Sequence, residues 1–336
     1  MITETMVFSS RSFRRFFQSE TTELKGIYES SLFSEKLFVE RENVKESFER
    51  FLLMSESEKI KLPRNIYLLV GCKGSGKTWS LVRLSTLLEQ KGKNVLFLLL
   101  RDKFWEPFIS AFKVSTLKDL RDTILDLYEN TGTITYVFLD SIDSLSEIET
   151  KKLFQVVKQL GGIKGVSFIL SIQRGDFCFN PRFSENYGEL RKYIYQFERD
   201  PITLRPISAL LGIFNYREFR EAKMKYKISI PSEFQDVFRY PLFMRKIYNR
   251  EYKVFKTAHI YDFLELSNDL RRALHERILL IKNSKERRVP LRVFKKNLSK
   301  SVFIKLVNYC FIRIFFEDND FYITLENFFL DTNWNI

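Results

Sequence analysis

The amino-acid sequence predicts an α/β fold with a doubly wound parallel sheet, followed by two smaller and mainly helical parts. Four nearly continuous apolar runs, at residues 66–70, 95–100, 134–139 and 166–171, are typical of strands buried on both faces of a parallel sheet. Amphipathic helical patterns lie between them, at residues 79–90, 117–128 and 148–160. This alternation predicts right-handed crossover connections, and it stops after Pro206.

Composition narrows the class of protein. The chain has 336 residues, enough for two or three compact units, and 55 Lys and Arg against 42 Asp and Glu give it a net charge of +13. Such a balance favours polyanionic partners, duplex DNA among them. The three Cys, without a CxxC pair, and the two isolated His argue against a zinc site and a disulfide framework.

The lengths of the apolar runs and the composition of the N-terminal stretch indicate where in the cell the protein is located. No run approaches the ~20 residues of a membrane span, so we expect no membrane partner. The lack of a disulfide framework predicts an intracellular protein, nuclear or cytoplasmic. The N-terminal stretch, rich in Ser and Arg, weakly resembles a mitochondrial presequence. An ordinary basic tail is the preferred interpretation of it.

The patterns divide the chain into four parts. We expect a flexible tail over residues 1–36 and a core over 37–205, which begins with an amphipathic helix and closes with a short strand at 202–204. A helical lid follows over 206–250, with helices at 207–225 and 232–248. In 251–336, a helical stripe at 260–278, helices at 291–298 and 302–314, and a hairpin turn at EDND follow in the order of a C-terminal winged helix.

A glycine-rich loop joins the first strand to its helix. The stretch GCKGSGKT fits the pattern G-x-x-x-x-G-K-[ST], with a buried strand before it and an amphipathic helix after it. Backbone N–H groups of such a loop curl around phosphates, and the helix start adds partial positive charge. Lys77 is expected to reach the β and γ phosphates and Thr78 to offer its hydroxyl to Mg²⁺. The predicted nucleotide-binding residues are Gly71, Cys72, Lys73, Gly74, Ser75, Gly76, Lys77 and Thr78.

An acidic strand end matches this loop. The strand ITYVFLD ends in Asp140, where a P-loop protein places the acid of its Mg²⁺ shell. Hydrolytic P-loop ATPases with an extra strand usually carry Glu at the next position, which here is Ser141, and Asp143 is the nearest replacement. Two interpretations of Asp143 stay open, a base or water-orienting group and the N-cap of the following helix. Slow or absent hydrolysis is therefore one expectation.

The fourth predicted strand also ends in polar residues. Ser171, Gln173 and Arg174 lie at the edge of a parallel sheet where such folds bind ligands. Ser171 or Gln173 is a candidate sensor of the γ-phosphate. Arg174 is either a residue that neutralises charge on that phosphate or a plain surface residue.

Together these segments resemble the additional-strand P-loop ATPases of the AAA+ and STAND groups over about residues 37–250. The resemblance depends on FVERENVKESFERFLL, GCKGSGKT, FLDSIDSL, LSIQR, ITLRPIS and YPLFMRK. It implies ATP and Mg²⁺ as cofactors, with Thr78 and Asp140 on the metal. It also implies catalytic roles for Lys77, Asp140 and Asp143, and assembly with other ATPase subunits into a homo-oligomer or hetero-oligomer.

Two branches of this resemblance stay open. FLDSIDSL looks like the acid motif of Orc/Cdc6 origin-binding proteins, whose layout is an AAA+ core, a helical lid and a C-terminal winged helix. In that branch Arg245 is the sensor that the lid brings to the γ-phosphate, while Ser141 and the lack of a clear Asn after the fourth strand depart from the pattern. NACHT-type STAND ATPases tolerate a small residue at Ser141, and Pro241 resembles their lid proline near the adenine. STAND proteins normally add sensor repeats, so a chain ending at Ile336 favours the first branch.

The third part is strongly basic. Residues 282–305 contain a single acid, Glu286, beside nine basic residues: Lys282, Lys285, Arg287, Arg288, Arg292, Lys295, Lys296, Lys300 and Lys305. If the helices at 291–298 and 302–314 pair as a helix-turn-helix, these charges line the turn and the helix meant for a DNA groove. The alternative is a solvated face.

The resulting hypothesis is an ATP-binding AAA+ switch with weak hydrolysis. Its nucleotide state would be coupled to subunit assembly and duplex DNA binding, as in replication-origin recognition. One alternative is a NACHT-type STAND regulator whose winged helix touches no DNA. The other is an inert ATP-binding subunit that stabilises a complex.

Overall fold

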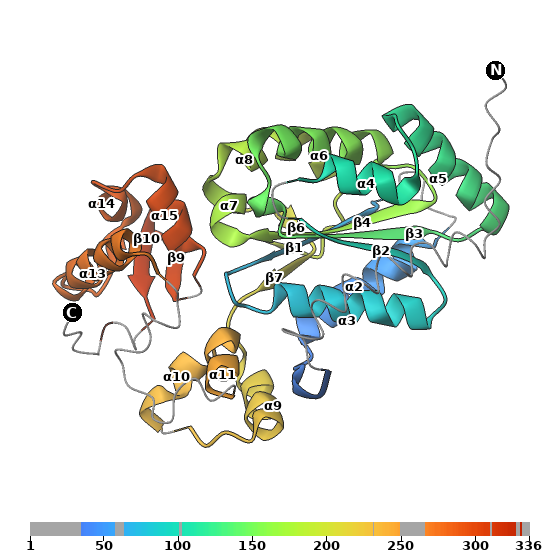
Figure 1. Ribbon diagram of the computed structural model, residues 1–336. Helices are drawn as coiled ribbons and strands as arrows, with labels where there is room; N and C mark the ends of the chain where they lie inside the picture. Colours follow the sequence, from blue (N-terminus) through green and yellow to red (C-terminus); the bar gives the residue numbers. More distant parts are fainter. Residues whose placement is uncertain are drawn as a thin grey trace.

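The structure is a computed structural model, and it describes residues 35–57, 64–100, 103–230, 232–248, 266–309, 311–326 and 330 (Figure 1). The first described element is a short 3-10 helix, η1 (Glu35–Leu37). Residues 1–34 of the expected flexible tail lie outside the described residues. Residues 260–265, the beginning of the expected helical stripe at 260–278, also lie outside them. No helix among the described residues is long and apolar enough to cross a membrane.

The core contains a five-stranded parallel sheet. Its strands are β1 (Ile66–Gly71), β2 (Asn94–Leu99), β3 (Thr135–Asp140), β4 (Val166–Gln173) and β7 (Ala209–Leu211), in the spatial order β2-β3-β4-β1-β7. Strand β4 therefore separates the strand before the glycine loop from the strand that ends in Asp140. The register pairs Gly71 with Gln173 and Leu99 with Asp140, so the carboxyl ends of the strands lie along one edge.

Helices cover both faces of the sheet, as Figure 1 shows. One face packs against α2 (Glu42–Ser55) and α3 (Lys77–Gln90). The other packs against α4 (Trp105–Phe112), α5 (Leu117–Thr131), α6 (Glu147–Leu160), α7 (Arg174–Phe179) and α8 (Pro181–Leu190). Side chains alternate along β1, with Leu68 and Val70 in one buried cluster and Tyr67 and Leu69 in the other. This confirms the predicted doubly wound α/β core, while α4, α7 and α8 were not predicted.

The segment that closes the sheet differs from the prediction. Residues 202–204 are not a strand but part of a turn between β5 (Glu198–Arg199) and β6 (Pro206–Ile207). The buried carboxylate of Asp200 forms this turn by accepting hydrogen bonds from the N–H groups of Ile202 (3.0 Å) and Thr203 (2.8 Å), and Leu204 has φ +55°. Strand β7 completes the sheet instead, beyond the expected end of the core at residue 205.

The lid is a small group of helices below the sheet edge. The expected helix at 207–225 begins only at Tyr216, in α9 (Tyr216–Tyr226), after a capping box between Asn215 and Glu218. It is followed by η4 (Ser232–Phe234), α10 (Gln235–Phe238) and α11 (Pro241–Tyr248). The prediction failed for residues 206–211 because a short buried strand and a buried helix segment share the same apolar composition.

The C-terminal part has the predicted order of helix, helix, helix and hairpin. Its elements are α13 (Asn268–Lys282), β8 (Val289–Pro290), α14 (Leu291–Lys295), α15 (Lys300–Val307), β9 (Ile312–Glu317) and β10 (Asp320–Leu325). The strands form an antiparallel sheet in the order β8-β10-β9, with Asp318 and Asn319 at positive φ in the hairpin turn. The helix expected through residue 314 ends at Val307, because β9 begins at Ile312.

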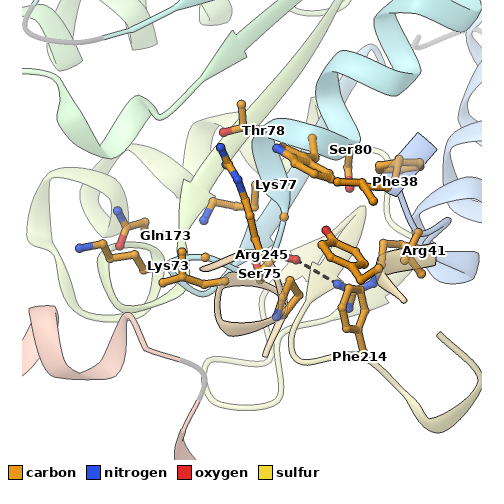
Figure 2. A pocket seen from close by; sticks show the side chains of 18 of the residues that line it. Phe38, Arg41, Lys73, Ser75, Lys77, Thr78, Ser80, Gln173, Phe214 and Arg245 are labelled. Atoms are coloured by element: carbon orange, nitrogen blue, oxygen red, sulfur yellow. Dashed lines mark hydrogen bonds between the residues drawn. The ribbon is translucent and has the colours of Figure 1, made fainter. Parts of the chain in front are cut away.

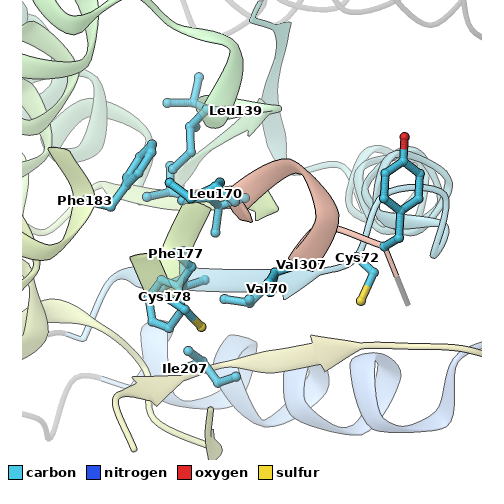
Figure 3. Packing of buried hydrophobic residues seen from close by; sticks show 14 of the residues in the cluster. Val70, Cys72, Leu139, Leu170, Phe177, Cys178, Phe183, Ile207 and Val307 are labelled. Atoms are coloured by element: carbon cyan, nitrogen blue, oxygen red, sulfur yellow. The ribbon is translucent and has the colours of Figure 1, made fainter. Parts of the chain in front are cut away.

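Helix α15 packs against the core through α7. Its buried residues are Phe303, Ile304, Leu306 and Val307, and Val307 belongs to the same buried cluster as Val70 and Cys72 (Figure 3). Gly175 of α7 lies so close that an added Cβ would stand 2.5 Å from the Ile304 carbonyl oxygen. A close contact of this kind requires glycine, so this surface of α15 is part of the protein interior.

Candidate functional site

The glycine loop has its carbonyl groups occupied. The Lys77 ammonium donates to the carbonyl oxygens of Gly71 (3.0 Å) and Cys72 (2.9 Å), and the Ser75 hydroxyl donates to the Cys72 carbonyl (2.8 Å). Gly74 and Gly76 have φ +73° and +97°, values that glycine adopts readily. With these carbonyls held, the N–H groups of residues 76–78, at the start of α3, can face an anion.

Asp140 lies between side chains from two neighbouring elements, α3 and β4. The Thr78 hydroxyl donates to Asp140 Oδ2 (2.6 Å), and the Ser171 hydroxyl donates to Oδ1. The contact exists because β4 lies between β1 and β3. The described residues include no group of three or more His, Cys, Asp or Glu placed so that it could hold a metal ion. Paired oxygens of Thr78 and Asp140 nevertheless fit Mg²⁺, which takes one or two protein ligands with phosphates and water.

Of the three polar residues at the end of β4, only Gln173 lines the cavity above the loop. Ser171 instead holds Asp140 and accepts a hydrogen bond from the Ser141 N–H (2.9 Å). Arg174 points to the buried carboxylate of Asp200, to which its Nε donates at 3.2 Å. Both side chains are thus engaged with protein partners in this structure, and the expectation that Ser171 and Arg174 contact the nucleotide stays a prediction.

Asp143 is not the N-cap of the following helix. Ser146 caps α6 by accepting from the Glu149 N–H, while Asp143 lies in η2 (Ile142–Ser144) and accepts from the Gln173 N–H at 3.0 Å. Burial raises the pKa of Asp143, the positive charge of Lys77 opposes that shift, and the negative charge of Asp176 adds to it. One oxygen of this carboxyl is therefore engaged by the backbone at the end of β4.

The cavity above the loop has a volume of about 300 Å³ and two chemically different ends. Residues 73–80 of the loop and α3, with Ser141 and Gln173, form the polar end. Figure 2 shows Phe38 and Phe214 at the other end. That end is apolar and is lined by Leu37, Phe38, Val39, Phe214, Tyr226, Pro241 and Leu242. A polar cradle beside an apolar pouch fits the phosphates and the base of a nucleotide.

Helix α11 of the lid brings both of its expected residues to this cavity. Arg245 lines it, with its Cζ 5.6 Å from the centre of the Trp79 ring, and Pro241 lines the apolar end. The lid also presses on the loop. An added Cβ on Gly74 would stand 2.8 Å from the Leu242 Cβ, and the Tyr240 hydroxyl donates to the Lys73 carbonyl.

The C-terminal part contacts the opposite side of the loop. The Lys73 N–H donates to the Asn308 carbonyl (2.5 Å), and the Lys73 ammonium lies 5.4 Å from the centre of the Tyr309 ring. The Asn308 side chain bridges to α7, accepting from the Gly175 N–H (2.7 Å) and donating to Asp176 (2.9 Å). One loop residue thus connects the cavity to the end of α15.

Sequence reasoning missed Arg41, which is 6% exposed and lines the cavity. Its guanidinium donates to the Ser75 carbonyl at 2.9 Å, the contact drawn in Figure 2. It also missed Phe38, Phe214 and Tyr240. Arg41 lies two positions after the apolar pair FV and directly before α2, and this local pattern gives no sign of a partner in the loop.

Comparisons with known proteins agree with this geometry. Residues 60–177 match a family model described as an AAA domain. No curated protein matches the chain. Three similar solved structures are Cdc6p from Pyrobaculum aerophilum (11% identity, TM-score 0.45, 90% of this chain and 94% of that chain), a RuvB variant from Thermotoga maritima (14%, 0.41, 85% and 93%) and AMPPCP-bound DnaA from Aquifex aeolicus (16%, 0.41, 83% and 83%).

Because the TM-scores of these three similarities are below 0.5, they do not support an inference about function. The sheet order, the glycine loop and the Thr78–Asp140 pair define a P-loop ATPase fold. Within it, residues 60–177 are the part that matches the AAA domain model.

Replacing Asp143 with Asn is expected to stabilise the protein, and more at about pH 8 than at about pH 5. The folded state raises the Asp143 pKa, so its stability falls relative to the unfolded chain as the pH rises through the folded pKa. Asn does not ionise, and its oxygen still accepts from the Gln173 N–H. Urea unfolding at both pH values measures the difference, with exposed Asp122→Asn as control. Equal effects of Asp143→Asn at both pH values would contradict the assignment.

Proposed function

We propose that the protein is an ATP-dependent switch, in which nucleotide at the glycine loop controls the position of the C-terminal domain and its access to duplex DNA. The observation that supports it is the contact between Lys73 of the loop and Asn308 at the end of α15. A γ-phosphate lies next to this part of the loop in a P-loop site. Nucleotide binding and the contact of α15 therefore depend on the same few backbone atoms.

The proposed roles follow the two ends of the cavity. The N–H groups of residues 74–78 cradle the phosphates, Lys77 turns from its carbonyl partners to them, and the pouch around Phe38 and Phe214 takes the adenine. Thr78 and Asp140 hold Mg²⁺, which neutralises phosphate charge when it is bound. Arg245 lines the cavity from the lid, where it can report the γ-phosphate.

Hydrolysis is proposed to be weak. Ser141 has no carboxylate, and its N–H is held by Ser171. Asp143 is half-buried, and one of its oxygens accepts from the Gln173 N–H. Ser141 therefore supplies no base, and Asp143 has one oxygen already engaged by the backbone.

We therefore expect ATP turnover below about 1 s⁻¹, the lower end of ordinary enzyme rates, and its loss in Lys77→Ala. Phosphate release by wild type and Lys77→Ala measures this, with exposed Lys91→Ala as the matched control. Turnover well above about 1 s⁻¹ would contradict the reading of Ser141 and Asp143. No turnover with retained ATP binding would leave the inert structural subunit as the better description.

The DNA-binding proposal concerns only part of the basic block. Arg288 is paired with Glu286 and Glu317, and Lys295 lies over the Phe179 and Phe303 rings, where burial lowers its pKa. The side chains of Arg288 and Lys295 therefore stabilise the fold and are not included among the proposed DNA contacts. The exposed basic residues are Lys285, Arg287, Arg292, Lys296, Lys300 and Lys305.

The burial of α15 limits how DNA can bind. Helix α15 packs its apolar face on α7, and its exposed Lys300 and Lys305 line a cavity with core residues such as Glu147, so the core lies beside the face that would enter a major groove. We propose that DNA first contacts the exposed charges of α14 and the preceding turn, and that α15 is released in the ATP-bound state. The same burial favours the alternative, a STAND-type regulator whose C-terminal domain packs internally and touches no DNA.

Mutation of three exposed residues separates these two functions. Lys285, Arg292 and Lys296 changed together to Ala should weaken duplex binding and reduce the slope of log K against log salt by up to about 2.7, because each lost phosphate contact removes about 0.9. Fluorescence anisotropy at several salt concentrations measures both quantities. The matched control removes the same charge from the core, at Lys118, Arg121 and Lys164.

Equal losses in the two triple variants would show only a nonspecific effect of net charge. No duplex binding by the wild type, with or without ATP, would favour the STAND-type alternative. Assembly with other ATPase subunits and a nuclear or cytoplasmic location remain part of the proposal.

A further inference from the structure

We infer that Arg41 is a positioning residue for phosphate binding. It fixes the peptide between Ser75 and Gly76 so that the Gly76 N–H faces the phosphates, and it connects this peptide to the lid. The inference extends the proposed nucleotide site and depends on it. It concerns a side chain that contacts the backbone carbonyl of Ser75 in the loop.

Arg41 is buried among acceptors that are far apart in the sequence. It lies at the N-cap position of α2, but its side chain does not cap that helix. Its Nη1 donates to the Ser75 carbonyl at 2.9 Å, and its Nε donates to Glu218 at 3.1 Å. A buried guanidinium is costly unless its donors are satisfied, so this geometry is strongly constrained.

The contact with Ser75 decides which way one peptide of the loop points. The described residues contain no cis peptide bond, so the Ser75 C=O and the Gly76 N–H lie on opposite sides of one planar group. With the carbonyl held by Arg41, the N–H points away from Arg41. Gly76 has φ +97°, and glycine alone moves easily between backbone regions there. An external donor is therefore needed to keep this peptide in one orientation.

Arg41 completes a set of donors to the loop carbonyls. Lys77 holds the Gly71 and Cys72 carbonyls, and the Ser75 hydroxyl holds the Cys72 carbonyl from inside the loop. Lys77 is expected to turn to the phosphates when nucleotide is bound, which removes its contribution. The hold of Arg41 on the Ser75 carbonyl does not depend on that movement. It can therefore keep its peptide oriented in both states.

The other half of Arg41 contacts the lid and the segment leading to it. Its Nη2 donates to the carbonyls of Gly212 (3.1 Å) and Ile213 (3.2 Å), and its Cζ lies 5.2 Å from the centre of the Phe214 ring. Glu218 in turn accepts from the Asn215 N–H (2.9 Å), which caps α9. The position of the lid and the orientation of the loop peptide are thus set by one guanidinium.

Two ligands distinguish positioning of the loop from support of the lid. Inorganic pyrophosphate contacts the loop alone, whereas ADP also contacts the apolar pouch that the lid helps to form. If Arg41 orients the loop, its loss weakens both ligands by a similar factor. If Arg41 only supports the lid, its loss weakens the binding of ADP and leaves the binding of pyrophosphate unchanged.

The experiment is calorimetric titration of Mg²⁺ pyrophosphate and MgADP into the full chain. Arg41→Met, which keeps the length but loses the donors, should bind both ligands about 10- to 100-fold more weakly. Glu218→Gln, which removes the negative charge of the ion pair with Arg41 and leaves the Arg41–Ser75 contact in place, should keep its pyrophosphate affinity within about twofold while losing ADP affinity. Arg41→Lys, which restores one donor, should recover part of the pyrophosphate affinity.

Urea unfolding of each variant shows whether it is folded. If Arg41→Met does not fold, the affinities of Arg41→Lys decide the test. The inference is overturned if a folded Arg41 variant binds pyrophosphate as tightly as wild type. It is also overturned if Glu218→Gln loses as much pyrophosphate affinity as Arg41→Met. A wild type that binds neither ligand would overturn the nucleotide site itself, a separate outcome that the wild-type titration alone reveals.

Discussion

The site depends on the position of β4 between β1 and β3. This order lets the Asp140 carboxylate accept from Thr78, which follows the loop after β1, and from Ser171 on β4. Both oxygens are then fixed, and the same carboxylate that would hold Mg²⁺ is oriented before any ligand arrives. A different strand order would leave these three residues at separate points along the sheet edge.

The glycine loop is contacted from three sides by parts of the chain that are distant in sequence. Arg41 holds the Ser75 carbonyl, Tyr240 of the lid holds the Lys73 carbonyl, and Asn308 accepts from the Lys73 N–H. Binding of phosphates would act on all three contacts, because they involve the backbone of one short loop. This arrangement gives a physical route from nucleotide to lid and C-terminal domain, and it explains why a switch is a better proposal than a rapid ATPase.

Local patterns predicted the loop, Asp140 and the four longer strands, because each depends on residues that are adjacent in the chain. Strand β7 was missed because three residues carry too little periodicity to distinguish a strand from a helix. The ion pair of Arg174 was not predicted because its partner, Asp200, is placed by a later turn. Arg41 escaped notice because its acceptors lie 34 and 177 positions away. The rest of the site therefore required the fold.

The most direct test of the coupling is hydrogen–deuterium exchange of residues 174–179 and 300–309, with and without a non-hydrolysable ATP analogue. Gly175→Ala supplies the undocked reference, because its Cβ would stand 2.5 Å from the Ile304 carbonyl oxygen. We predict that the analogue raises exchange in both segments toward the level of Gly175→Ala. Unchanged exchange in both segments, at a concentration where the analogue is shown to be bound, would contradict the coupling of nucleotide to the C-terminal domain.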